Sequence, residues 1–161
     1  MAKKEAAQYP TARIETTHGT FEVELWNDVA PRHSENFQKL ARKGFYNGVI
    51  FHRILKGLVI QGGCHDGNGT GGPGWTVKAE FNNRPHEPGV LSMARSAHPD
   101  SGGSQFFVCL TRENCKHLDG QYTAFGRVTS GMDVVNKIAA VECNRDGMPK
   151  SPPKMTKVTA P

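Results

Sequence analysis

Polar side chains interrupt several apolar stretches of the sequence, and three of them could serve a binding site. Arg53 stands inside the apolar stretch 49–55. Gln61 ends another apolar run, and Gln105 precedes two phenylalanines. Their chemistry is directed hydrogen bonding, because a guanidinium donates and an amide both donates and accepts. Such residues either face solvent or serve a site, and these runs alone leave both interpretations open.

Other chemistries have weaker support. The interval 62–74 holds seven glycines and predicts a long surface loop. Its segment 67–72 resembles a phosphate cradle, but neither a Lys-Ser/Thr pair nor a helical pattern follows. Cys64, His65 and Asp66 are adjacent, a spacing that rarely lets three side chains converge on one metal ion. No serine lies in a G-x-S-x-G turn, which disfavours a hydrolase.

Periodic patterns predict the elements that must position these side chains. Alternation at 13–17 and 20–26 predicts a hairpin. Apolar residues at helical spacing predict helices over about 31–43 and 132–139. Further short strands are expected at 49–55, 58–61, 90–94, 105–110, 123–128 and 154–159. Seven or eight short strands with two helices indicate an antiparallel barrel or sandwich.

Composition limits the class of protein. The chain has 161 residues, 37% hydrophobic and 22% charged, which suits one folded domain. The 18 glycines and 10 prolines favour a turn-rich fold. The net charge of +5 comes from scattered basic residues, so we expect no nucleic-acid partner.

Cysteine usage and hydropathy predict the compartment. Four cysteines without a C-x-x-C pair predict free thiols in a reducing environment, and Cys64 and Cys115 are expected in loops where they could be redox-sensitive. The N-terminus lacks an apolar signal segment, and no stretch approaches about 18 apolar residues. We therefore expect a cytoplasmic protein that has no membrane partner.

Six short motifs follow one another along the sequence: FHRI at 51–54, QGG at 61–63, LSMAR at 91–95, SQFF at 104–107, LDG at 118–120 and FGRV at 125–128. Together they resemble the motifs of the cyclophilin-type peptidyl-prolyl cis-trans isomerases. The order and spacing match over about 12–159. The resemblance implies a mainly β fold, a closed eight-stranded antiparallel β-barrel capped by two α-helices, with an exposed groove on its wall. The isomerase domain would span 11–161, after a short polar extension at 1–10.

The resemblance also implies a reaction in which no covalent bond is broken. Rotation about an X-Pro bond faces a barrier of about 18–20 kcal/mol, and turnover in milliseconds requires about 10⁵-fold acceleration, or about 7 kcal/mol. At the twisted transition state the prolyl nitrogen becomes a hydrogen-bond acceptor, so a fixed cationic donor stabilises that state selectively. We therefore expect neither a metal ion nor another cofactor.

Matched motifs assign roles to individual residues. Arg53 corresponds to the family's catalytic arginine, and Gln61 would position Arg53 or bind the substrate backbone. Phe107 completes the predicted catalytic set, as a wall of the apolar pocket for the proline ring, although without the family match ordinary core packing would be the preferred explanation for Phe107 and Leu118. The predicted substrate-binding residues are Phe51, His52, Leu58, Val59, Ala94, Arg95, Ser96, Gln105, His117, Leu118 and Tyr122.

Some positions depart from the common family pattern. Leu58 and Val59 replace the usual Phe and Met, which predicts a shallower proline pocket. His117 stands where many members have the tryptophan that supports cyclosporin binding, so we expect cyclosporin to bind only weakly. Tyr122 replaces a frequent histidine and Arg95 a common asparagine.

The leading hypothesis is a monomeric isomerase that acts on proline-containing segments of unfolded or flexible client proteins and assists their folding. An alternative is a module that binds proline-containing peptides with little turnover. A third class, a nucleic-acid binder, would show salt-dependent retention by DNA or RNA.

Overall fold

The structure of the protein is a computed structural model, which describes residues 9–161. Most of the predicted extension 1–10 therefore lies outside the described residues. Within 9–161, no helix is both long enough and apolar enough to cross a membrane.

The fold is mainly β, and its N-terminal part confirms the predicted hairpin. Strands β1 (Thr11–Thr16) and β2 (Gly19–Leu25) pair antiparallel. The burial of β2 alternates, with Phe21, Val23 and Leu25 facing inward, as a half-buried strand requires. The remaining strands are β3 (Val49–Ile50), β4 (Arg53–Leu55), β5 (Val59–Gly62), β6 (Val90–Met93), β7 (Phe106–Cys109), β8 (Ala124–Ser130) and β9 (Lys154–Thr159).

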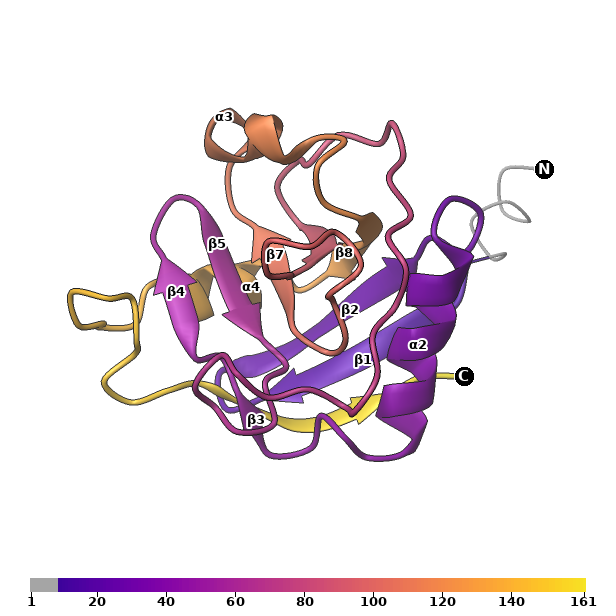
Figure 1. The fold of residues 1–161 in the computed structure, drawn as a ribbon. Helices are drawn as coiled ribbons and strands as arrows, with labels where there is room; N and C mark the ends of the chain where they lie inside the picture. Colours follow the sequence, from indigo (N-terminus) through magenta and orange to yellow (C-terminus); the bar gives the residue numbers. More distant parts are fainter. Residues whose placement is uncertain (1–8) are drawn as a thin grey trace.

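The predicted closed eight-stranded barrel is wrong in strand number and in closure. Nine strands form one curled sheet in the order β3-β9-β1-β2-β8-β6-β7-β5-β4, whose outer strands β3 and β4 do not pair with each other (Figure 1). The predicted single strand 49–55 is interrupted at Phe51 and His52, so its first part pairs with β9 and its second with β5. One segment of the chain thus supplies both edges of the sheet.

Three α-helices are present among the described residues, one more than predicted. The two expected helices are α2 (Pro31–Arg42) and α4 (Met132–Ala139). The third, α3 (Arg112–Cys115), is a single turn that continues into the 3₁₀ helix η1 (Lys116–Leu118). Such a turn has no apolar period to detect, and it begins where the Thr111 hydroxyl accepts a hydrogen bond from the Asn114 N–H.

Two apolar clusters pack on opposite faces of the sheet. The larger cluster fills the inside of the curl and includes Phe37 of α2 and Ile138 of α4. The smaller cluster contains Phe107 and Cys109 of β7, together with Cys115 of α3. Consecutive side chains of a strand point to opposite faces, so the adjacent residues Phe106 and Phe107 belong to different clusters. We call the larger cluster the inner cluster and the smaller one the outer cluster. A ligand could reach the protein at the outer cluster.

Gly131, at the start of α4, tests how tightly this helix is docked. Its φ is +90°, and a Cβ there would lie 2.7 Å from the Thr20 carbonyl oxygen. Gly48 has a similar φ of +85° but open space around it. We expect Gly48→Ala to lower the free energy of unfolding by about 1–2 kcal/mol through backbone strain, and Gly131→Ala by about 1–3 kcal/mol more through the clash. Urea unfolding measures both, and equal losses would contradict the close contact.

Candidate active site

Arg53, Gln61 and Phe107 form one row across three neighbouring strands. Arg53 of β4 is paired with Gln61 of β5, and Gln61 is paired with Phe107 of β7. Directly opposed side chains of an antiparallel sheet project from the same face, about 4.5–5.5 Å apart at Cβ. The register therefore places a cation, an amide and an aromatic ring side by side.

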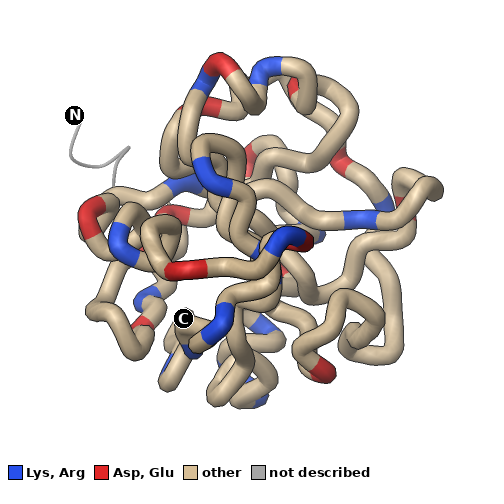
Figure 2. Tube along the Cα trace, turned by 90° about the vertical axis from the view of Figure 1, so that its left-hand side faces the viewer, with Lys and Arg blue, Asp and Glu red and all other residues tan. Residues whose placement is uncertain are grey.

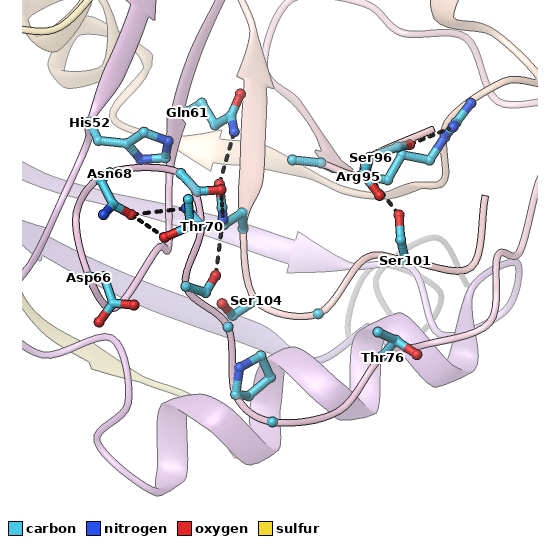
Figure 3. A pocket seen from close by; sticks show the side chains of 18 of the residues that line it. His52, Gln61, Asp66, Asn68, Thr70, Thr76, Arg95, Ser96, Ser101 and Ser104 are labelled. Atoms are coloured by element: carbon cyan, nitrogen blue, oxygen red, sulfur yellow. Dashed lines mark hydrogen bonds between the residues drawn. The ribbon is translucent and has the colours of Figure 1, made fainter. Parts of the chain in front are cut away.

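Arg53 and Gln61, the two polar members of this row, differ in how firmly their side chains are held. The Arg53 side chain is exposed and makes no hydrogen bond or ion pair with any residue of 9–161. Gln61 donates from Nε2 to Gln105 Oε1 at 3.1 Å, and Gln105 donates in turn to the Gly69 and Gly71 carbonyls at 2.9 and 3.0 Å (Figure 3). Gln61 is therefore fixed by Gln105, and Arg53 keeps its donors for a ligand.

Phe107 provides an apolar surface at the other end of the row. Its ring is 5% exposed and meets the Tyr122 ring edge-on, with centroids 5.8 Å apart. Leu58, Val59 and Leu118 belong to the same outer cluster. Phe107 therefore packs in the outer cluster and not in the inner cluster, and its contact with the proline ring stays a prediction.

A cavity of about 870 Å³ runs alongside the polar part of this row. The glycine-rich loop forms its other wall, where Figure 3 shows Asn68 and Thr70 opposite Gln61. Predicted site residues that line it are His52, Arg53, Gln61, Ala94, Arg95, Ser96 and Gln105. The cavity thus joins the predicted polar residues with a loop that was predicted only as surface.

The segment around Arg95 leaves backbone groups free at the cavity. The Ala94 N–H donates to the Gln105 carbonyl at 3.0 Å, whereas the Arg95 N–H and C=O make no hydrogen bond within residues 9–161. The Arg95 guanidinium donates to the Gln121 carbonyl and lies 4.5 Å from the centroid of the Tyr122 ring. A fixed, unpaired stretch of backbone of this kind can pair with an extended peptide.

Comparison with known proteins decides the family. A profile described as "Cyclophilin type peptidyl-prolyl cis-trans isomerase/CLD" matches residues 11–160. The chain belongs to this family.

Individual relatives agree with this assignment. A peptidyl-prolyl cis-trans isomerase of Helicobacter pylori is 46% identical over 140 residues, covering 84% of each chain. Peptidyl-prolyl cis-trans isomerase B of Bacillus subtilis is 50% identical over 120 residues, 73% of this chain and 82% of the relative.

Solved structures agree as well. The crystal structure of a Cryptosporidium parvum cyclophilin type peptidyl-prolyl cis-trans isomerase matches with a TM-score of 0.90 at 29% identity, covering 95% of this chain and 98% of that one. A second crystal structure of that protein, in the presence of the dipeptide Ala-Pro, has a TM-score of 0.88 at 30% identity and covers 92% and 97%. The predicted isomerase function is confirmed, and the module without turnover is set aside.

Several predicted site residues of this cyclophilin do not line the cavity. Five of them belong to the outer cluster, namely Leu58, Val59, Phe107, Leu118 and Tyr122, whereas Phe51 and His117 belong to neither the cavity nor that cluster. Phe51 is fully buried and packs edge-on against Phe106 in the inner cluster, so its side chain does not reach the cavity in this structure. The interruption of the strand at Phe51 and His52 breaks the alternation that would have turned the ring outward. His117 is exposed on η1, beside Leu118, and does not line the cavity.

A buried hydrogen-bond chain behind Phe107 was missed by the sequence analysis. His86 stacks on Phe107 with an interplanar angle of 22°, and its Nδ1 and Nε2 lie 3.0 Å from Asp119 Oδ1 and 2.8 Å from Ser92 Oγ. The hydrogen bond from Arg112 holds the pKa of Asp119 well below its usual range, whereas burial lowers the pKa of His86. Asp119 stood in a recognised motif, but His86 carried no signal in the sequence.

The thiols that were expected in loops are both buried. Cys64 Sγ accepts hydrogen bonds from the Gly69 and Gly71 N–H groups at 3.2 and 3.1 Å. Burial raises the pKa of Cys64, but these bonds outweigh that effect and hold it below the ordinary value. Cys115 lies in α3, where hydrogen bonding with Cys109 lowers its pKa to about 7. The predicted loop position is therefore confirmed for Cys64 and wrong for Cys115, and all four cysteines are free as predicted.

The charge of Arg53 should be detectable at its neighbour. His52 is 7% exposed, and burial together with the Arg53 charge lowers its pKa. Arg53→Gln removes a positive charge, so we expect the pKa of His52 to rise while burial still keeps it below the ordinary value. An NMR titration measures it, with Arg13→Gln on β1 as the control. An unchanged pKa in Arg53→Gln would show that the two side chains are not coupled.

Proposed function

We propose that Arg53 is the catalytic residue of this isomerase and that its guanidinium donates a hydrogen bond to the prolyl nitrogen at the twisted transition state. The nitrogen lone pair is delocalised in both planar ground states and becomes an acceptor only when resonance is lost. A donor placed there therefore binds the transition state better than either isomer. The observation that carries the proposal is the free, exposed guanidinium at the head of the row with Gln61 and Phe107.

The remaining predicted residues hold the substrate around the rotating bond. Phe107, Leu58, Val59, Leu118 and Tyr122 receive the proline ring, and burial of that ring contributes about 1–2 kcal/mol. Gln61 is anchored by its hydrogen bond to Gln105. Its side-chain carbonyl oxygen accepts no hydrogen bond from residues 9–161 and is therefore available to the substrate backbone. The bound ring stays fixed while the carbonyl group before the proline rotates. The binding energy of the ring is thereby used to orient the rotating bond.

The client is an extended, proline-containing segment of an unfolded or flexible chain, whose folding the isomerase assists. The free N–H and C=O of Arg95 would pair with its backbone, and His52, Ala94 and Ser96 line its path. The Ala-Pro dipeptide named for the Cryptosporidium parvum structure supports a proline-directed site. We assign this function to residues 11–161, acting as a monomer in the cytoplasm without a nucleic-acid partner.

Replacing Arg53 tests its role. We expect Arg53→Ala to lower kcat/KM by about 100-fold, in the range observed when one preorganised transition-state donor is removed. Arg53→Lys should recover only part of the loss, since an ammonium lacks the planar fork of a guanidinium. A protease-coupled or NMR exchange assay on a short X-Pro peptide measures both. A loss smaller than about tenfold in Arg53→Ala would rule out the assigned role.

Position 117 tests the proposed weak binding of cyclosporin. His117 is exposed on η1 and offers less apolar surface than the tryptophan found in many relatives. We expect His117→Trp to tighten cyclosporin binding by about tenfold or more, at about 1.4 kcal/mol for each factor of ten, with isomerase activity retained. An inhibition titration measures it, and tight inhibition of the unchanged protein would contradict the prediction.

A further inference from the structure

A second, shallower groove lies between α2 and the segment 75–78. Its volume is about 460 Å³, and its apolar floor is formed by Pro31, Trp75 and Val77. Trp75 and Thr76 line both this groove and the cavity beside Arg53. Figure 3 shows the segment that carries Thr76 passing over α2 at the end of the main cavity. The two depressions are therefore neighbours that share one wall.

The shared wall is held rigidly by a single buried amide. Trp75 donates from Nε1 to Asn36 Oδ1 at 2.8 Å, and Asn36 donates from Nδ2 to the Gly103 carbonyl at 2.7 Å. Asn36 is 7% exposed, and Gly103 lines the main cavity. The Trp75 indole, 37% exposed, is thus fixed relative to both grooves. A peptide that crosses it meets a preformed surface and need not order the protein first.

The groove carries unpaired positive charge. Arg32, Lys39 and Lys78 line it, and none of them forms an ion pair with a residue of 9–161. Lys43 adds a further unpaired ammonium, 5.7 Å from the centroid of the Trp75 ring. Figure 2 shows acidic and basic residues interspersed along much of the trace, so this excess of one sign is local.

Acidic residues near the groove are already engaged. Glu35, which lines it, pairs with Arg42 at 3.1 Å. Glu80 accepts the backbone N–H groups of Arg32 and His33 at 3.1 and 2.9 Å, where its carboxylate satisfies the start of α2. Of the charged residues that line the groove, three are basic and only Glu35 is acidic, so the net charge of the lining is positive. The surface is therefore complementary to an acidic ligand.

We infer that this groove binds an acidic stretch of the client chain itself, adjoining the X-Pro bond held at Arg53. The inference rests on the proposed function, because it extends the same client past Trp75 onto α2. Its cations would attract Asp and Glu side chains, and Trp75 and Val77 would contact their methylene groups and neighbouring apolar residues. The enzyme would thus prefer proline-containing clients with acidic flanks.

Peptide extension tests the preference. One X-Pro peptide is extended by a run of glutamates, on its N-terminal or C-terminal side, and a matched peptide carries glutamines. We expect the acidic run on one side to lower KM by about three- to tenfold at low salt, through several exposed ion pairs. The kcat should not change, because contacts remote from the rotating bond stabilise ground and transition states equally. The gain should disappear in about 0.5 M salt.

Charge reversal locates the effect. Lys39→Glu/Lys78→Glu should abolish the gain, whereas Lys137→Glu/Lys154→Glu, with the same change of net charge on α4 and β9, should retain most of it. Circular dichroism and turnover of the glutamine peptide report folding and basal activity. Equal KM values for the two peptides, or equal losses in the two double variants, would overturn the inference. Failure of the proposed function would appear differently: Arg53→Ala would turn over the glutamine peptide about as fast as the unchanged protein does.

Discussion

The antiparallel pairing of β4, β5 and β7 is the constraint on which the active site depends. Because backbone hydrogen bonds fix which residues lie opposite one another, Arg53, Gln61 and Phe107 share one face although they are far apart in the sequence. A shift of one residue in any of the three strands would turn its member of the row toward the inner cluster. The core therefore selects the register, and the register assembles the chemistry.

The glycine-rich loop completes the site by a different means, since it has no sheet pairing to hold it. Side-chain hydrogen bonds hold its shape in place of the backbone hydrogen bonds that strands would make. Cys64 accepts two backbone N–H groups of the loop, and Gln105 donates to two of its carbonyls. Gln105 also holds Gln61, so one amide fixes both the wall of the cavity and the middle of the row formed by Arg53, Gln61 and Phe107.

Local patterns were sufficient to predict the hairpin, α2, α4 and most strands, since each depends on a periodic apolar face. The proposed roles of Arg53 and Phe107 required the ordered motifs, because a cation in an apolar run has the same local sequence pattern whether it meets solvent or substrate. What could not be predicted depends on distant contacts. The interruption at Phe51 and the stacking of His86 on Phe107 are decided by residues remote in sequence, and α3 is a single turn too short to show an apolar period.

The interruption at Phe51 and His52 has a consequence for an enzyme that handles unfolded chains. Exposed sheet edges invite other chains to add strands, and such chains are the substrate of this isomerase. Here the edges are β3, with two residues, and β4, with three. Both are too short to template a further strand. If clients bind as proposed, through the proline and a few backbone groups at Arg95, they can be released without being drawn into the sheet.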